Sequence, residues 1–193
     1  MAAPILIVTG CSAVGKSTVS RHLARSVGDS VHFPIDALLF FFDDPFPEPD
    51  TQEGSRRYRV VGAAVAATAA QLAEGGYTVI LDGPMLPDGA DSMAERLERR
   101  GIEVHYVVLR TDFDVCLERS LRRDAATTDA TVLRSYHARF VDLGESEANV
   151  IDASGSPEQV AASVLSAFRS GRLARSRTAR HQPKAARLVD GGL

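Results

Sequence analysis

Lysine is nearly absent from this chain of 193 residues. Arginine supplies all but two of the 22 basic side chains, and the two lysines are Lys16 and Lys184. A composition that avoids lysine yet keeps Lys16 in a glycine-containing segment indicates a specific task for that ammonium group. Cysteine is also scarce. Cys11 and Cys116 have neither the spacing of a metal site nor the number needed for a disulfide framework.

Long apolar runs are missing as well, and no stretch reaches the length of a transmembrane helix. Met1–Pro4 has no basic residue and the first apolar run stops at Gly10, which is unlike a secretory signal. The net charge of −3 argues against a general basic surface for nucleic acid. We therefore expect a soluble, cytoplasmic protein without membrane or nucleic-acid partners, in an oligomeric state that the sequence leaves open.

One segment carries the strongest functional signal. It reads Gly10-Cys11-Ser12-Ala13-Val14-Gly15-Lys16-Ser17 and matches the phosphate-binding P-loop pattern G-x-x-x-x-G-K-[ST]. It lies between an apolar run and a helical start at Thr18, the strand–loop–helix context that the motif requires. Tight turns at the glycines point successive N–H groups into one concavity for phosphate oxygens. We predict that residues 10–18 bind ATP, that Lys16 reaches the β- and γ-phosphates, and that Ser17 holds Mg²⁺.

Short apolar runs alternate with segments of helical character along the chain. The expected strands are Ile5–Val8, Val31–Ile35, Tyr77–Leu81, Val104–Leu109 and Asn149–Ile151. The expected helices are about Lys16–Val27, Glu53–Glu74, Asp91–Arg100, Asp112–Arg123, Ala130–Leu143 and Pro157–Arg169. This alternation predicts an α/β fold of the P-loop NTPase type, with a five-stranded parallel sheet, helices on both faces and a helical lid. Pro34 lacks an N–H group, so the second run suits an edge strand or a strand end.

Polar residues follow most of the expected strands. They are Thr9-Gly10, Asp36, Asp82-Gly83, Arg110 and Asp152. Ligands of such sheets bind at the carboxyl ends of the strands, so these residues are expected to gather at the site.

Two stretches interrupt the alternation. Residues 40–50 are aromatic, then acidic and proline-rich, and fit either a surface loop or a mobile flap on the substrate side. From Arg172 onward the chain holds six of the 22 basic residues and a single acid. We predict a basic, disordered tail over residues 171–193 that aids solubility rather than binding nucleic acid.

Motifs of several P-loop classes are absent from the sequence. It contains no N-K-x-D segment, which argues against the common GTPases, and no L-S-G-G-Q-like segment. Asp82 is followed by Gly83-Pro84, without the glutamate that polarises water in motor-type ATPases. The compact kinase type remains, which transfers phosphate to a bound acceptor beneath a lid.

Residues 4–170 resemble the small P-loop kinases of the nucleoside-monophosphate-kinase superfamily, especially the gluconate kinase, shikimate kinase and chloramphenicol phosphotransferase types. The resemblance rests on the P-loop and on Pro34–Leu39, Val79–Gly83 and Val150–Pro157. It implies a kinase domain over residues 1–170 with a lid at about 124–145. It also implies that the loop containing Ser154, Gly155 and Pro157 borders the adenine of ATP.

The same resemblance implies roles for arginines on the helix expected at Asp112–Arg123. In the kinases that the chain resembles, one arginine of this helix lies against the adenine and others contact the phosphates. By that pattern the resemblance implies ATP binding for Arg119 and catalysis for Arg123, two residues that lie four apart on one helical face. The alternative is a solvated helix whose arginines pair with Glu118 and Asp124.

Two carboxylates are candidates for the chemistry. We expect Asp36 to act as general base toward an acceptor hydroxyl, although it also suits a helix N-cap. Asp82 is expected to bind Mg²⁺ or the acceptor. The alternative is that Asp82 serves only as a turn residue in Asp82-Gly83-Pro84. Arg57 opens the long helix and is a candidate substrate contact. His32, His105 and His137 have no partner spacing and are expected to be structural.

The sequence therefore predicts an ATP- and Mg²⁺-dependent kinase that phosphorylates a hydroxyl of a small molecule such as a sugar acid or an antibiotic. Two alternatives stay open. One is a nucleotide or nucleoside kinase, and the other is a nucleotide-binding regulatory or RNA-associated protein that uses the basic tail.

Overall fold

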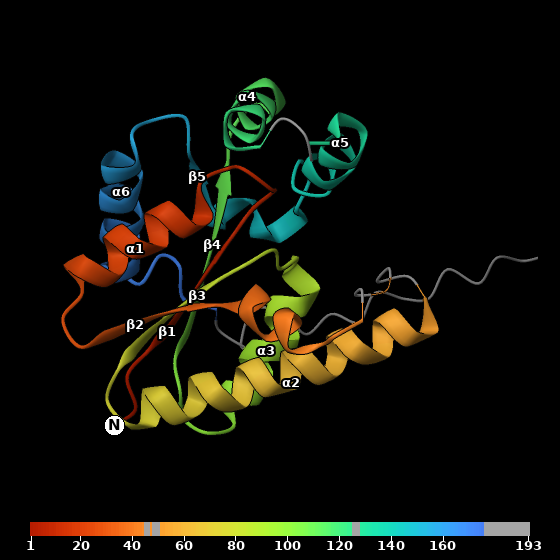
Figure 1. Ribbon diagram of the computed structural model, residues 1–193. Coiled ribbons are helices and arrows are strands. Elements are labelled where there is room, and N and C mark those ends of the chain that lie inside the picture. The colour runs from red at the N-terminus through yellow and green to blue at the C-terminus, as the bar shows by residue number, and fades with distance from the viewer. Residues whose placement is uncertain (45–46, 48–50, 125–127, 176–193) are drawn as a thin grey trace, which may run out of the picture.

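The computed structural model describes residues 1–44, 47, 51–124 and 128–175. Five parallel strands form one sheet in the order β2-β3-β1-β4-β5 (Figure 1). They are β1 (Ile5–Thr9), β2 (Ser30–Pro34), β3 (Thr78–Asp82), β4 (Val104–Arg110) and β5 (Val150–Asp152). All five residues of the central strand β1 are buried, as expected for an apolar strand covered on both faces. The predicted sheet is confirmed, and Pro34 ends the edge strand β2.

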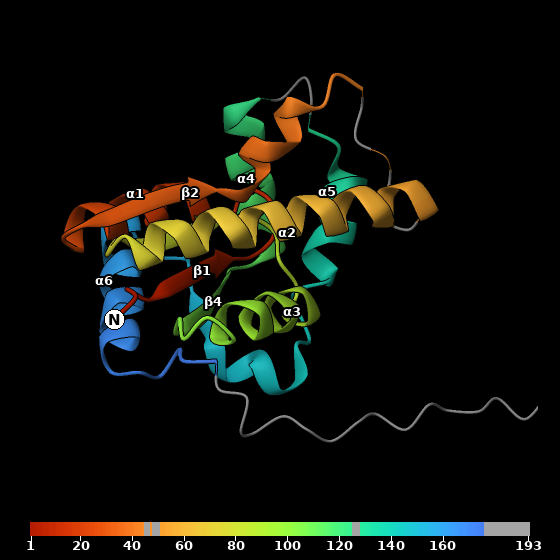
Figure 2. The same cartoon turned by 90° about the horizontal axis from the view of Figure 1, so that it is seen from below.

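Helices cover both faces of this sheet. Helices α1 (Lys16–Ser26) and α6 (Pro157–Arg169) pack together on one face, and α2 (Gln52–Glu74) and α3 (Pro87–Glu98) lie on the other (Figures 1 and 2). Helices α4 (Phe113–Arg123) and α5 (Ala130–Ala138) pack against each other beyond the carboxyl ends of the strands. Two short 3₁₀ helices, η1 (Ile35–Phe41) and η2 (Gly144–Asn149), precede α2 and β5. None of the described helices has the length and apolar character needed to cross a membrane.

Two helix boundaries differ from those expected by more than two residues. Helix α3 begins at Pro87 rather than near Asp91, because proline is well suited to the first helical position, where its missing N–H has no intrahelical partner. Helix α5 ends at Ala138 rather than at Leu143. Phe140 and Leu143 nevertheless belong to the hydrophobic core, so the segment after α5 is anchored by burial rather than by helical hydrogen bonds.

The first residues of the expected tail pack on the body of the protein. The backbone N–H of Tyr106 donates to the Leu173 carbonyl over 2.9 Å, and the N–H of Arg175 donates to the Val104 carbonyl over 2.9 Å. Arg175 is 4 % exposed, forms an ion pair with Asp91 and stacks 4.4 Å from the centroid of the Tyr106 ring. Disorder from residue 171 is therefore wrong for residues 171–175, because these contacts fix them beside β4. The rest of the predicted tail, 176–193, lies outside the described residues.

Candidate active site

The polar strand ends meet at one edge of the sheet. In the strand register, Asp82 at the end of β3 pairs with Val8 of β1 on one side and with Pro34 of β2 on the other. The P-loop follows β1 and η1 follows β2, so Asp82 lies between the phosphate-binding loop and Asp36. Asp36 is in the first turn of η1, and Pro34 is its N-cap. The alternative reading of Asp36 as an N-cap is therefore wrong.

The P-loop adopts a backbone that its glycines make possible. The φ angles are +143° at Gly10, +61° at Ala13 and +113° at Gly15, and Gly15 is the N-cap of α1. A Cβ atom on Gly10 would lie 2.3 Å from the Leu109 carbonyl oxygen. The loop therefore wraps the N-terminus of α1 in contact with β4, as a phosphate-binding nest requires.

Lys16, the first residue of α1, is the electrostatic centre of the site. Its Nζ atom donates a hydrogen bond to the Cys11 carbonyl over 2.8 Å. Burial lowers the pKa of the Lys16 ammonium, and the carboxylates of Asp82 and Asp36 act in the opposite direction. The Arg123 guanidinium adds to the lowering of this pKa. Two carboxylates and a second cation thus lie within electrostatic reach of Lys16.

Two cavities meet at this cluster. The smaller one has a volume of about 350 Å³ and is lined by Ala13, Gly15, Lys16, Ser17, Thr18, Arg21 and Arg123. The larger one has a volume of about 1240 Å³ and contains Asp36 in its wall. Lys16 and Arg123 line both cavities. The pair therefore stands at the junction between a basic cavity on the P-loop and a separate space on the side of η1.

The wall of the larger cavity is built by elements that the sequence analysis did not predict to lie together. It includes Ile35 and Leu39 of η1, the segment Pro84–Leu86, and side chains of α2, α3 and α5. The Thr9 hydroxyl accepts from the Met85 N–H over 2.7 Å, and the Tyr106 hydroxyl donates to the Met85 carbonyl over 2.9 Å. These two buried residues, Thr9 and Tyr106, fix the segment after β3 against the sheet.

Asp82 has a partner that sequence reasoning missed. Asp82 is 3 % exposed, and its Oδ2 atom lies 3.1 Å from Nε2 of His32 on the neighbouring strand β2. His32 was expected to be structural, but this contact makes it part of the site. The signal was its position in β2, two residues before Pro34, on a strand paired with the one that ends at Asp82.

The second carboxylate, Asp36, has a raised pKa. Asp36 is exposed as a whole residue, but the atoms packed around its carboxyl group partly desolvate it, which raises the pKa. Lys16 opposes this shift, and the charge of Asp82 adds to it. A carboxylate with a raised pKa accepts a proton more readily than an ordinary aspartate.

Arg119 connects the P-loop to the loop that follows β5. Its Nη1 atom donates to the Val14 carbonyl over 2.9 Å and its Nη2 atom donates to the Ala153 carbonyl over 3.2 Å. The alternative of a pairing with Glu118 is wrong for Arg119, because Glu118 pairs with Arg122. Arg119 therefore holds together the two loops that were expected to border ATP.

The residues expected beside the adenine lie at the start of α6. Ser154, Gly155 and Pro157 are exposed and line neither cavity. They are held by a capping box, in which the Ser156 hydroxyl accepts from the Gln159 N–H and the Gln159 side chain accepts from the Ser156 N–H. Arg119 connects this loop to the P-loop through its hydrogen bonds to the Ala153 and Val14 carbonyl groups.

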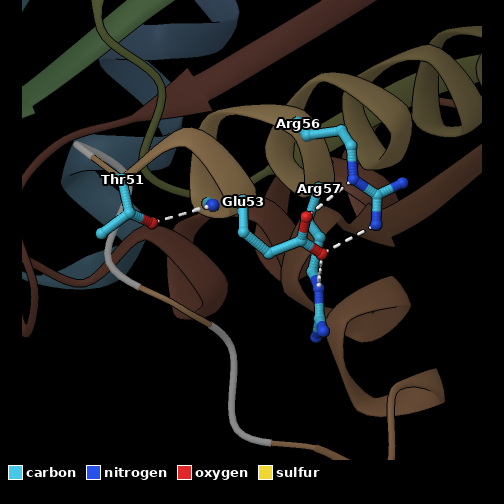
Figure 3. A network of polar contacts seen from close by, with 5 residues as sticks. Thr51, Glu53, Arg56 and Arg57 are labelled. Atoms are coloured by element: carbon cyan, nitrogen blue, oxygen red, sulfur yellow. Dashed lines mark hydrogen bonds and ion pairs between the residues drawn. The ribbon is translucent and has the colours of Figure 1, made fainter.

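Arg57 does not reach the larger cavity. Its Nε atom donates to Glu53 over 2.7 Å, and Arg56 binds the same carboxylate, as Figure 3 shows. The Thr51 hydroxyl caps this end of α2 by accepting the Gly54 N–H. The two guanidinium groups lower the pKa of Glu53 to about 2. Arg57 is therefore occupied by its own helix, and the following residues, Tyr58 and Arg59, line the cavity instead.

The two cysteines touch, which their distance along the chain gave no reason to expect. The Sγ atoms of Cys11 and Cys116 lie 3.3 Å apart, and both residues are buried free thiols. The ligand atoms of this pair and of His137 lie within 4.8 Å of one another, while His137 Nε2 also bonds the Thr111 carbonyl over 2.9 Å. The hydrogen bond from Cys116 lowers the pKa of the Cys11 thiol against the opposing effect of burial.

The donor set suits a nucleoside triphosphate with its metal ion. The smaller cavity offers the start of α1, the Ser17 hydroxyl and the cations Lys16, Arg21 and Arg123. Helix N-termini and such cations bind phosphate oxygens, and a hydroxyl with a carboxylate such as Asp82 is the kind of oxygen set that Mg²⁺ uses beside phosphates.

Comparison of the sequence with models of known protein families finds a match. The model of the AAA domain family matches residues 5–143, which is more than half of the chain. The chain belongs to the AAA domain family. No curated protein matches this AAA domain chain.

Several solved structures similar to this AAA domain chain are named as kinases of small molecules. A gluconokinase from Sinorhizobium meliloti has a TM-score of 0.64 and 19 % identity, with 86 % of this chain and 92 % of that chain covered. A tunicamycin resistance protein from Deinococcus radiodurans has a TM-score of 0.62 and 23 % identity, with 90 % and 99 % covered. An APS kinase from Mycobacterium tuberculosis, in complex with AMPPNP and APS, has a TM-score of 0.67 and 18 % identity, with 87 % and 98 % covered. The predicted resemblance to small P-loop kinases is confirmed, and the chain has a P-loop fold like that of these kinases.

Proposed function

We propose that this protein is an ATP-dependent kinase that transfers the γ-phosphoryl group to a hydroxyl of a small molecule. One observation carries the proposal: Lys16 and Arg123 line both cavities. Phosphoryl transfer needs positive charge at the point where donor and acceptor meet, because negative charge spreads over the equatorial oxygens in the transition state. The smaller cavity then takes the nucleotide phosphates and the larger one takes the acceptor.

The chain's own residues supply the steps. Asp36 takes the proton of the acceptor hydroxyl, whose oxygen forms a bond to the γ-phosphorus while the bond to the leaving oxygen of ADP breaks. Lys16 and Arg123 stabilise the charge on the transferred group. Ser17 and Asp82 are the residues that would hold Mg²⁺, which neutralises phosphate charge when bound. His32 orients the Asp82 carboxylate through their hydrogen bond.

The similar structures support the reaction type and leave the acceptor open. Their names point to acceptors of different chemistry, such as gluconate for one and APS for another. We therefore carry over ATP as donor and a small molecule as acceptor. Arg119 and the loop at Ser154 and Gly155 are proposed to hold the nucleotide base, since Arg119 ties this loop to the P-loop.

Release of ADP in the presence of a panel of hydroxylated acceptors tests the proposal. Lys16→Ala and Asp36→Asn should each lower acceptor-dependent turnover, and Asp36→Asn by about 10²–10⁴-fold if it removes the general base. Asp114→Asn is the matched control, because Asp114 is an exposed acid in the first turn of α4 that lines neither cavity. Turnover that survives both site substitutions would refute the roles given to Lys16 and Asp36. ATP binding with no acceptor that stimulates turnover would refute the kinase and favour a regulatory nucleotide-binding protein.

A further inference from the structure

We infer that the acceptor is an amphipathic anion, meaning a hydroxylated molecule with a sizeable apolar body and a carboxylate or phosphate group. That this ligand is the phosphoryl acceptor rests on the proposed function. Its chemical class is inferred from the larger cavity alone. Two features of that cavity carry the inference: its buried apolar interior and the arginines along its exposed side.

The apolar feature is a set of buried side chains in the cavity wall. Val61 of α2, Met93 of α3, Leu133 of α5 and Phe140 are all at most 6 % exposed. At about 1240 Å³, the cavity exceeds the roughly 300–1,000 Å³ that is usual for small-molecule sites. Other apolar side chains of the wall do have surface to cover: Ile35, Leu39, Met85 and Leu86 are partly buried, and Val132 is 56 % exposed. A small polyhydroxylated acceptor would leave most of these five side chains in contact with water, whereas an acceptor with an apolar body covers them and gains the free energy of burial.

The basic feature is a group of three exposed arginines from separate elements. Arg59 of α2, Arg96 of α3 and Arg139 after α5 line the larger cavity and not the smaller one. None of them forms an ion pair with a residue in the described part of the chain. Arg139 lies 5.6 Å from the centroid of the Tyr136 ring, which also lines the cavity.

Seven of the arginines outside this cavity are engaged in ion pairs, whereas, within the part of the chain that the structure describes, Arg21, Arg25, Arg119, Arg134, Arg169 and Arg172 are not. Ion pairs with glutamate or aspartate engage Arg56, Arg57, Arg99, Arg100, Arg110, Arg122 and Arg175. None of these seven lines the larger cavity. Among the acids that do, Asp129 is engaged as the N-cap of α5, where it accepts the N–H groups of Thr131 and Val132. Positive charge therefore converges on an apolar space from three elements, which is the arrangement that an amphipathic anion fits.

The placement of the charges also separates the two ends of such a ligand. Lys16 and Arg123 lie at the junction of the cavities and face the transferred phosphoryl group, while Arg59, Arg96 and Arg139 line the larger cavity alone. The anionic group of the acceptor thus binds away from the hydroxyl that Asp36 activates.

A pair of fluorescent dyes tests the inference without ATP or turnover. Anilinonaphthalene sulfonate is an amphipathic anion, and N-phenylnaphthylamine is a neutral dye of similar shape. Each is titrated into the wild-type chain and into the triple variant Arg59→Gln/Arg96→Gln/Arg139→Gln. The control triple variant, Arg56→Gln/Arg99→Gln/Arg122→Gln, makes the same change in net charge at exposed arginines outside the cavity.

We expect both dyes to bind the wild type. The cavity variant should weaken binding of the sulfonate about tenfold, since each exposed ion pair contributes modestly, and change binding of the neutral dye less than about twofold. The control variant should leave both affinities within about twofold. Equal losses in the two triple variants, or no loss in either, would overturn the anion preference, and a neutral dye that fails to bind would overturn the apolar body.

The acceptor panel separates this inference from the proposed function. It contains apolar hydroxylated carboxylic acids, each beside its neutral methyl ester, and phosphate monoesters, each beside its neutral dimethyl ester. Faster turnover of the neutral esters would overturn the inference while supporting the kinase. If the dyes bind as expected but no compound of the panel is phosphorylated, the proposed kinase activity is refuted. The preference of the cavity for an amphipathic anion would still be supported.

Discussion

Gly10 offers the sharpest test of the geometry of the site. Replacing Gly10 by alanine places a Cβ atom on a residue with a φ of +143°, at 2.3 Å from the Leu109 carbonyl oxygen and 3.0 Å from a methyl carbon of Val14. The first effect is backbone strain, which costs about 1–3 kcal/mol for a side chain in such a conformation. The second is a steric clash with the backbone of β4, which requires the strand and the P-loop to move apart and costs about 1–3 kcal/mol more.

Gly76 separates these two contributions. Its φ is +93°, and nothing lies within 4 Å of a Cβ atom built on it, so Gly76→Ala carries the strain without the clash. Both substitutions also restrict the unfolded chain to the same extent, so this effect cancels in the comparison. We expect Gly76→Ala to lower the free energy of unfolding by about 1–2 kcal/mol and Gly10→Ala to lower it by about 3–5 kcal/mol.

Urea unfolding followed by far-ultraviolet circular dichroism measures both variants. Gly10→Ala should in addition weaken ATP binding, because the relief of the clash moves the first turn of the P-loop. If the two variants lose the same stability within about 0.5 kcal/mol, the close approach of the P-loop to β4 is refuted.

Three further perturbations follow from the site. The raised pKa of Asp36 means that its ionised form is less favoured in the folded chain than in the unfolded chain. As the pH rises through the pKa that Asp36 has in the folded chain, Asp36 ionises in a site that disfavours its charge, and the free energy of unfolding falls. Asp36→Asn should therefore unfold at a higher temperature than the wild type at neutral pH, with the gain disappearing below the pKa of about 3.9 of an ordinary aspartate. In the wild type, kcat/KM should fall on the acid side at a pH above that value, and a flat acid limb would contradict the role as a base. Arg119→Ala removes two hydrogen bonds to carbonyl groups and should lower the free energy of unfolding by about 1–3 kcal/mol and raise the Kd for ATP. Calorimetry that finds the same ATP affinity would separate Arg119 from nucleotide binding. Hydrogen peroxide should convert Cys11 and Cys116 into an intramolecular disulfide, with loss of two hydrogens from the intact mass and formation of water. Cys116→Ala serves as control, and thiols that stay reduced while free glutathione is oxidised would show that the pair is protected.

Much of the fold was predictable because it depends on local patterns. Each of the five apolar runs is a strand, and the P-loop fixes the order strand, loop, helix around Lys16. Pro34 even predicted a strand end, because a missing N–H group is a property of one residue. The boundaries that differed, such as the start of α3 at Pro87, are positions where several neighbouring residues could each begin or end the helix. The contacts of the adjoining loop decide between them.

The site was less predictable because it depends on contacts between distant segments. The pairing of His32 with Asp82 follows from the register of two strands, and the contact of Cys11 with Cys116 follows from how α4 docks on the P-loop. Arg57 illustrates the opposite case, since its residue type suited a substrate contact but Glu53, four residues earlier, engages it. Residue type thus identified the candidate groups, and packing decided which of them reach the cavities.

The short segment after α6 also determines where the chain can be cut. Leu173 and Arg175 satisfy the hydrogen bonds of Tyr106 and Val104, along the part of the β4 edge that the shorter strand β5 does not cover. A fragment that ended at residue 170 would leave these backbone groups open, and an open sheet edge is a template on which another chain can add a strand. Shortening this protein at the end of α6 would therefore expose a sheet edge that promotes aggregation, whereas ending it after Arg175 keeps that edge covered.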